Sequence, residues 1–144
     1  MKTQPIIVSA CLAGIFCRYN GDVEPFEPVV ELIREGRAIP FCPEAHGGLP
    51  TPRQPCEIQD SRVLDVDGND VTTEFVRGAE EGLRLAKLVG CTEAILKARS
   101  PSCGSGVIYD GTFTSSRIPG NGVFAALLKE NGIIVRSEED LDSK

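Results

Sequence analysis

Short apolar runs alternate with longer amphipathic segments along most of the chain. The apolar runs have strand length and no helical periodicity, which predicts buried strands; they lie at residues 5–11, 38–42, 92–98 and 133–135. The amphipathic segments carry apolar stripes at helical spacing, which predicts helices; they run from Pro25 to Arg34, from an N-cap at Thr72 or Thr73 to Leu88, and from an N-cap at Asn121 to Lys129. This alternation predicts an α/β fold, a Rossmann-like three-layer sandwich with a mainly parallel β-sheet.

The other segments read as loops and ribbons. Residues 43–57 are rich in proline and glycine, so we expect an irregular loop, and long loops in compact domains are often functional. Residues 58–66 predict a short strand or edge ribbon, closed by a turn at Asp67-Gly68. Residues 107–114 predict a hairpin that turns at Asp110-Gly111, and the acidic C-terminal tail is expected to be solvated.

Length and charge narrow the class of protein. A chain of 144 residues fits a single domain over residues 1–144. The net charge of -6 argues against a general polyanion binder, so nucleic acid is not an expected partner. The apolar stretch from Pro5 to Cys17 is interrupted and too short to span a membrane, and Ile15 stands where a lipoprotein cleavage box needs cysteine. We therefore expect a cytoplasmic protein with no membrane partner, and no oligomeric state follows from the composition.

Three cysteines follow three of the predicted strands. Cys11 and Cys42 end their apolar runs directly, and Cys103 follows its run through a short turn. Ligands of open parallel sheets bind beyond the carboxyl ends of the strands, so we expect these thiols to meet in one crevice. Of the six cysteines in the chain, Cys91 reads as a space-filling core residue, and the roles of Cys17 and Cys56 stay open.

Three converging thiolates suit a soft metal centre with one open position. A zinc ion with three cysteines and water would satisfy this, and so would an iron–sulfur cluster with one uncapped iron. A cysteine nucleophile is the alternative; it needs an activating base, for which His46, the one histidine in the chain, is the candidate. The segment from Cys11 to Arg18 approaches the C-x₅-R loop of low-molecular-weight tyrosine phosphatases, but one extra residue changes the phosphate cradle.

Polar residues flank the three cysteines. Glu44 could exchange a proton with a water molecule, an assistance worth about 10²–10⁴ in rate. Ser100 and Ser102 could orient a polar substrate, and Arg53 could anchor an anionic group.

Together these motifs resemble the thiouracil desulfidase family, and the resemblance spans nearly the whole chain. The matching stretches are Ser9-Ala10-Cys11-Leu12, Cys17-Arg18-Tyr19-Asn20-Gly21, Phe41-Cys42-Pro43-Glu44, Gly47-Gly48-Leu49-Pro50-Thr51-Pro52-Arg53 and Ser100-Pro101-Ser102-Cys103-Gly104. The resemblance implies a [4Fe–4S] enzyme that removes sulfur from a thiolated pyrimidine, such as thiouracil or thiouridine monophosphate, by hydrolysis and without net redox change. A non-catalytic metal or cluster module and a metal-independent cysteine hydrolase are the alternatives.

The resemblance also implies roles for single residues. Cys11, Cys42 and Cys103 would be the cluster ligands, and the uncapped iron would bind the substrate's sulfur. Glu44 would assist the attacking water, and the catalytic serine falls on Ser100 or Ser102. The candidate substrate contacts are Ser9, Asn20, which stands where many relatives have aspartate, and Arg53.

Overall fold

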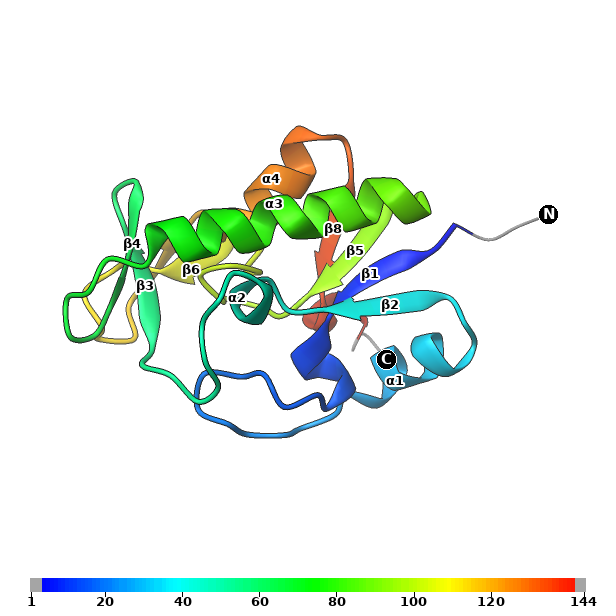
Figure 1. Cartoon of the computed structure of the whole chain (residues 1–144), viewed down its shortest axis with the longest axis horizontal. Coiled ribbons are helices and arrows are strands. Elements are labelled where there is room, and N and C mark those ends of the chain that lie inside the picture. The colour runs from blue at the N-terminus through cyan, green and yellow to red at the C-terminus, as the bar shows by residue number, and fades with distance from the viewer. Residues whose placement is uncertain (1–3, 142–144) are drawn as a thin grey trace.

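The computed structural model describes residues 4–141 and is built around a four-stranded sheet (Figure 1). Its strands pair in the order β2-β1-β5-β8, and every pairing is parallel. They are β1 (Ile6–Ser9), β2 (Ala38–Phe41), β5 (Glu93–Leu96) and β8 (Ile134–Ser137). In the sheet, β2 lies on one side of β1, whereas β5 and β8 lie on the other side. The strand order therefore reverses between β1 and β5. Crevices of α/β folds lie at such a reversal.

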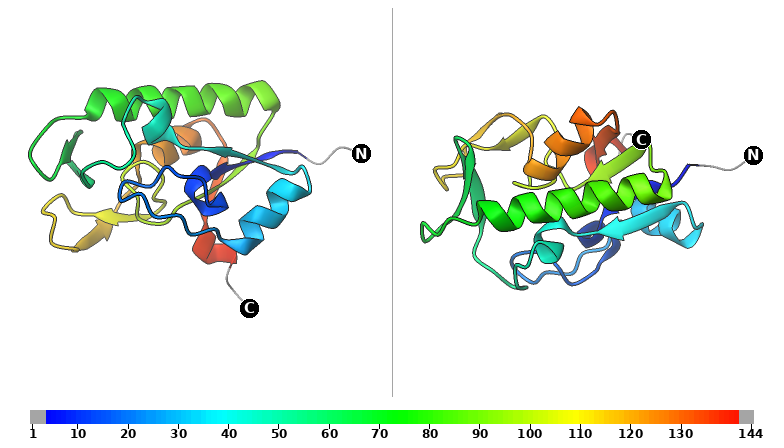
Figure 2. Two further views of the ribbon diagram at one scale, coloured as in Figure 1. Left: turned by 60° about the horizontal axis from the view of Figure 1, so that its bottom comes forward. Right: turned by 45° about the horizontal axis from the view of Figure 1, so that its top comes forward.

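Helices cover both faces of this sheet, which confirms the predicted three-layer α/β class (Figure 2). One face carries α3 (Thr72–Val89) and α4 (Val123–Glu130), and the other carries α1 (Glu27–Arg34) with the 3₁₀ helix η1 (Ala10–Ala13). Successive side chains of a strand point to opposite faces. Ile7 accordingly packs in the cluster with Phe124 of α4, while Ile6 and Val8 pack in the cluster with Val29 of α1.

Two glycines let α3 approach the elements that shape the crevice. A Cβ at Gly78 would collide with the backbone carbonyl of Pro43, the first residue of the short helix α2 (Pro43–His46). A Cβ at Gly82 would lie 2.5 Å from the ring of Phe124 and 2.7 Å from that of Phe41. Gly78 therefore lets α2, which carries Glu44, pack directly against α3, and Gly82 leaves room for the two rings from β2 and α4.

Two antiparallel hairpins lie beyond the carboxyl ends of the parallel strands, at the left of Figure 1. The first pairs β3 (Cys56–Gln59) with β4 (Arg62–Asp65), and the second pairs β6 (Val107–Tyr109) with β7 (Arg117–Pro119). Within residues 4–141, none of the helices is long and apolar enough to cross a membrane.

The predicted helix caps were wrong. Val71 is the N-cap of α3, because the Thr72 hydroxyl instead accepts the Val63 amide of β4 at 2.8 Å. Gly122 is the N-cap of α4, because the Asn121 side chain accepts the Gly106 amide at 2.9 Å. The Thr72 hydroxyl therefore bonds to a distant strand, and the Asn121 side chain bonds to the distant Gly106 amide and to Lys129 near the end of α4, at 2.8 Å, rather than to the first turn of that helix.

Several loop predictions also need correction. Cys11 lies within η1 rather than at the end of β1, and residues 43–57 are not wholly irregular, since they contain α2 and the first residues of β3. The second hairpin extends to Pro119 around a wide connection at residues 110–116. The acidic tail is not simply solvated, because Glu138 accepts the Ala98 amide at 2.8 Å.

Candidate active site

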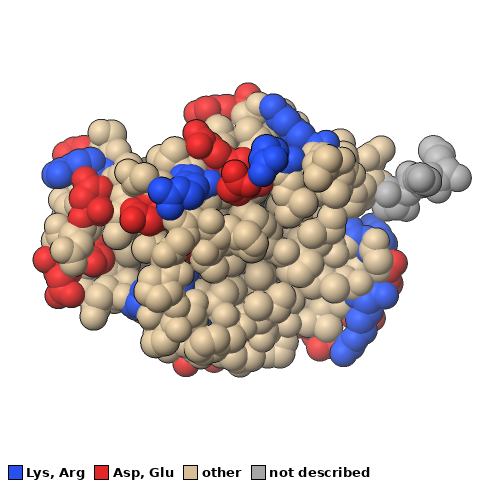
Figure 3. All heavy atoms as spheres, viewed as in Figure 1, with Lys and Arg blue, Asp and Glu red and all other residues tan. Residues whose placement is uncertain are grey.

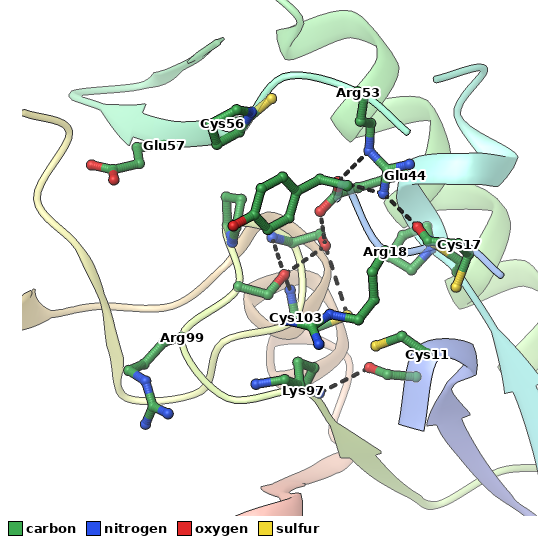
Figure 4. A pocket seen from close by; sticks show the side chains of 18 of the residues that line it. Cys11, Cys17, Arg18, Glu44, Arg53, Cys56, Glu57, Lys97, Arg99 and Cys103 are labelled. Carbon is green, nitrogen blue, oxygen red and sulfur yellow. Dashed lines mark hydrogen bonds and ion pairs between the residues drawn. The ribbon is translucent and has the colours of Figure 1, made fainter. Parts of the chain in front are cut away.

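A pocket of about 460 Å³ opens where the strand order reverses (Figure 4). Its walls come from η1, α2, the loop after β5 and the two hairpins. This volume is within the range of about 300–1,000 Å³ that is usual for small-molecule sites. The fold thus gathers segments that are far apart in the sequence around one cavity.

Cys11, Cys42 and Cys103 all line this pocket, as their positions after three strands predicted. The turn after η1 is closed by Gly14 in the left-handed region (φ 84°), which keeps Cys11 near the end of β1. Cys42 is the N-cap of α2, and its sulfur accepts the Ala45 amide at 3.5 Å. The Ser100 hydroxyl accepts the Cys103 amide at 3.0 Å, which folds the loop so that this cysteine faces the cavity.

The three thiols differ in acidity. Burial raises the pKa of Cys11 to about 11, and burial likewise raises the pKa of Cys103. The Cys17 thiol donates a hydrogen bond to Cys42, and together with the Ala45 amide it lowers the pKa of Cys42 to about 6. Cys42 is therefore the member of the set that most readily carries a negative charge.

Two further cysteines, left open by the sequence, also line the pocket. Cys17 is buried, and its pKa is raised because its proton is held in the bond to Cys42. Cys56, at the start of β3, is partly buried, and burial raises its pKa to about 12. Cys91 lies instead in the hydrophobic core with α3 and α4, in agreement with its space-filling interpretation.

An ion pair and two serines form a connected network in the pocket wall. Arg53 binds Glu44 Oε1 through both Nε and Nη2, each at 2.9 Å, and the side chains are only 7% and 12% exposed. Ser102 Oγ donates to Glu44 Oε2 at 2.8 Å and lies 3.0 Å from Ser100 Oγ. Since the single Ser102 proton points to Glu44, Ser100 is the donor to Ser102. The hydroxyls thus form a chain that ends at one carboxylate oxygen.

Arg53 is committed to several protein acceptors. Besides Glu44, it donates to the carbonyl oxygens of Cys17 at 2.9 Å and Pro50 at 2.8 Å, and to the Thr51 hydroxyl at 3.1 Å. The guanidinium therefore connects α2 to the loop that contains Cys17 and to the loop that follows α2. Its contact with an anionic substrate group stays a prediction.

The remaining predicted residues are placed differently. Ser9 lines the pocket, is buried, and accepts the Lys97 amide at 2.9 Å, which joins the ends of β1 and β5. Asn20 bonds to Asp22 in an exposed turn and is not among the pocket-lining residues. His46 stacks on Phe41 with ring centroids 4.4 Å apart and is likewise outside the pocket lining, so it is not placed to activate a pocket cysteine.

The sequence indicated no role in this pocket for its basic and aromatic wall residues, although Arg18 and Tyr19 lie in one of the stretches that resemble the family. These wall residues are Arg18, Lys97, Arg99, Tyr19, Tyr109 and Phe113. Figure 4 shows Arg18 reaching into the middle of the labelled pocket side chains. On the face seen in Figure 3, by contrast, acidic and basic side chains lie beside one another. Several basic residues occur in the segments that follow the strands and line the pocket. Their occurrence at these positions is the sequence signal that could have indicated an anionic ligand.

The thiols fit a group larger than one ion. Among the residues that the structure describes, no set of three or more cysteine, histidine or acidic side chains is arranged to hold a single metal ion. The three pocket thiols nevertheless line one cavity, from η1, from the N-cap of α2 and from the loop after β5. A cubane cluster spreads its cysteine ligands over different irons, so thiols that line one cavity without surrounding a single point fit it better than they fit zinc.

Comparisons with known proteins agree with this chemistry. The family model described as 2-thiouracil desulfurase matches residues 6–140. An uncharacterized protein, YbbK of Bacillus subtilis (strain 168), is 45% identical over 147 residues, which cover 95% of this chain and 97% of that protein. The solved structure of the [4Fe–4S]-dependent thiouracil desulfidase TudS (DUF523Vcz) is similar with a TM-score of 0.93 and 48% identity, over 97% of this chain and 94% of that one.

Proposed function

The chain belongs to the 2-thiouracil desulfurase family, and from this premise we propose that it is a [4Fe–4S]-dependent enzyme that hydrolytically removes sulfur from a thiolated pyrimidine. The observation that carries the proposal is the convergence of three cysteines, each of which follows a different strand, on one pocket that also holds a buried carboxylate. The reaction replaces the C=S bond of the substrate by C=O: water supplies the oxygen, and the sulfur leaves as sulfide.

Cys11, Cys42 and Cys103 would hold the cluster. When bound, the cluster supplies a soft Lewis acid that matches the soft sulfur of a thiocarbonyl group. Cys42 suits this role, because hydrogen bonds from the Cys17 side chain and the Ala45 amide lower its pKa to about 6 and would stabilise a thiolate ligand. The two more strongly buried thiols, with raised pKa values, would lose their protons when the metal binds.

Glu44 would take the proton from the attacking water. Its Oε1 already accepts two Arg53 N–H groups, so Oε2 is the oxygen with room for a proton. Ser102 is 2% exposed and reaches Oε2 directly, whereas Ser100 is less buried and lies at the outer end of the hydroxyl chain. We therefore propose that Ser100 contacts the substrate. Ser102 would connect Ser100 to Glu44 through its two hydrogen bonds.

The basic pocket residues favour a nucleotide over the free base as substrate. Arg18 pairs with Glu24 at 3.2 Å, but the Glu24 side chain is 74% exposed. Exposed ion pairs contribute only about 0–1 kcal/mol, so a phosphate could replace this carboxylate. Lys97 and Arg99 also line the pocket; they pair with Glu138 at 3.4 Å and with Glu139 at 2.8 Å, so they would meet a phosphate by exchanging these carboxylates for it.

A reducing compartment such as the cytoplasm suits this chemistry, since all six cysteines are free. A cysteine hydrolase that uses His46 is the weaker alternative, because that ring lies against Phe41 and outside the pocket lining.

The test is sulfide release by the anaerobically reconstituted enzyme from 4-thiouracil, 4-thiouridine and 4-thiouridine monophosphate. We expect turnover of thiopyrimidines, with the highest kcat/KM for the monophosphate. Arg18→Ala should remove most of that preference, whereas Arg62→Ala, which changes an exposed arginine of β4 outside the pocket lining, should not. Equal kcat/KM values for all three compounds would contradict the nucleotide assignment.

A further inference from the structure

One wall of the pocket is built from an unusual backbone segment. The connection between β6 and β7, residues 110–116, contributes Phe113 and Ser115 to the pocket lining. Both residues have positive φ angles, 60° and 65°, in the left-handed region that bulky side chains rarely adopt. Such conformations persist only where the surroundings over-determine them, and they cluster at ligand sites.

The connection is held in this shape from β3, on the other hairpin. Glu57 Oε1 accepts the Gly111 amide at 2.9 Å and the Phe113 amide at 3.1 Å. Gln59, two residues along the same strand, donates to the Gly111 carbonyl oxygen at 2.6 Å. A Cβ at Gly111 would lie 2.7 Å from the Ile58 carbonyl oxygen, so only glycine permits this approach.

The segment is also stiffened from within. The Asp110 carboxylate accepts both the amide and the hydroxyl of Thr112, at 3.0 Å and 2.6 Å. Hydroxyl contacts continue from Thr112 to Thr114 and on to Ser116, at 2.6 Å and 3.1 Å. The loop thus has a fixed shape before any ligand binds.

We propose that Phe113 is a specificity-determining wall that packs against the pyrimidine ring of the substrate, and that Glu57 is the positioning residue that fixes it. The inference rests on the proposed thiopyrimidine substrate. Every nucleobase has a flat ring that can stack on an aromatic side chain. One such stacking contact changes binding affinity by about tenfold or more. A wall that is ordered in advance loses no conformational freedom on binding. Glu57 takes no part in the proposed reaction. Positioning Phe113 therefore explains why its carboxylate accepts two charge-assisted hydrogen bonds from the connection.

The positioning role of Glu57 can be tested without activity. The chain has no tryptophan, so the F113W variant carries a single indole as a reporter at the wall. In the holoenzyme, Glu57→Ala added to F113W should shift the indole emission to longer wavelength, because the connection loosens and the indole meets water. Glu57→Gln keeps a carbonyl acceptor and should leave the emission nearly unchanged, as should Arg62→Ala on the paired strand β4. Equal emission in the Glu57→Ala and Glu57→Gln backgrounds would overturn the positioning role.

The role of the wall is tested with ligand. Uridine monophosphate, the desulfurated nucleotide, should quench the indole of F113W holoenzyme. With 4-thiouridine monophosphate, Phe113→Ala and Glu57→Ala should each raise KM by about tenfold with kcat within about threefold of wild type. Iron content should match wild type, and Glu57→Gln should restore KM.

The outcomes separate the two proposals. Turnover by wild type with an unchanged KM in Phe113→Ala overturns the wall and leaves the proposed function standing. No turnover of any thiopyrimidine by a fully loaded wild-type enzyme overturns the proposed function, and the wall with it.

Discussion

The ion pair between Arg53 and Glu44 gives the most quantitative prediction. Both side chains are almost fully buried, and Arg53 Nε and Nη2 each lie 2.9 Å from Glu44 Oε1. Arg53→Met keeps most of the apolar stem but leaves the carboxylate without its positive partner. Breaking a buried pair from one side costs about 3–5 kcal/mol, because an uncompensated charge remains.

In a domain of this size, each kcal/mol moves the melting temperature by about 2–4 °C. The melting temperature of Arg53→Met should therefore fall on the order of 10 °C. The double variant E44Q/R53M buries no unpaired charge and should recover part of this loss, about 2 kcal/mol. Anaerobic calorimetry of reconstituted enzyme, with iron content matched between variants, measures both effects.

Arg34→Met is the matched control. Arg34 pairs with Glu27 and Glu31 on α1, but its side chain is 64% exposed. Exposed pairs of this kind contribute little to stability, so the control should melt close to wild type. If Arg53→Met melts as high as Arg34→Met, or if E44Q/R53M is no more stable than Arg53→Met, the reasoning about the buried pair is wrong.

Three further predictions concern the chemistry of the pocket. Alanine at any of the proposed ligands Cys11, Cys42 and Cys103 should abolish both the iron–sulfur absorbance and sulfide release, whereas Cys91→Ala should keep both. If one of the three ligand variants retains a full cluster, that cysteine is not a ligand. Glu44→Gln should lower kcat by about 10²–10⁴ with the cluster intact, and a kcat within a few-fold of wild type would exclude Glu44 as the base. Exposure to air should bleach the cluster within the time in which anaerobic samples are stable, because only three cysteines would hold it in the proposed ligand set; unchanged absorbance after prolonged aerobic storage would argue for a further ligand.

The parallel sheet and the meeting of three cysteines could be predicted because both follow from local pattern. Apolar runs of strand length that alternate with amphipathic helices limit the fold to a few topologies, and the strand ends then place Cys11, Cys42 and Cys103 at one edge. Motif resemblance added the identity of the cofactor and the reaction, which spacing alone left open between zinc, a cluster and a nucleophile.

Features that depend on partners distant in the sequence could not be predicted in this way. Thr72 has the chemistry of an N-cap, but the Val63 amide competes for its hydroxyl. Glu57 bonds to Phe113 across two hairpins, and no periodicity connects them. Asn20 lies in a stretch that resembles the family, yet its side chain turns back to Asp22 and away from the pocket lining. Each of these outcomes is decided by hydrogen bonds that form only once the chain has folded.

The most direct measurement is anaerobic reconstitution with iron and sulfide, followed by metal and acid-labile sulfide counts and an assay on 4-thiouracil. The account predicts about four irons per chain and release of sulfide with formation of uracil. A protein that holds no cluster, or a fully loaded one that turns over no thiopyrimidine, would contradict it.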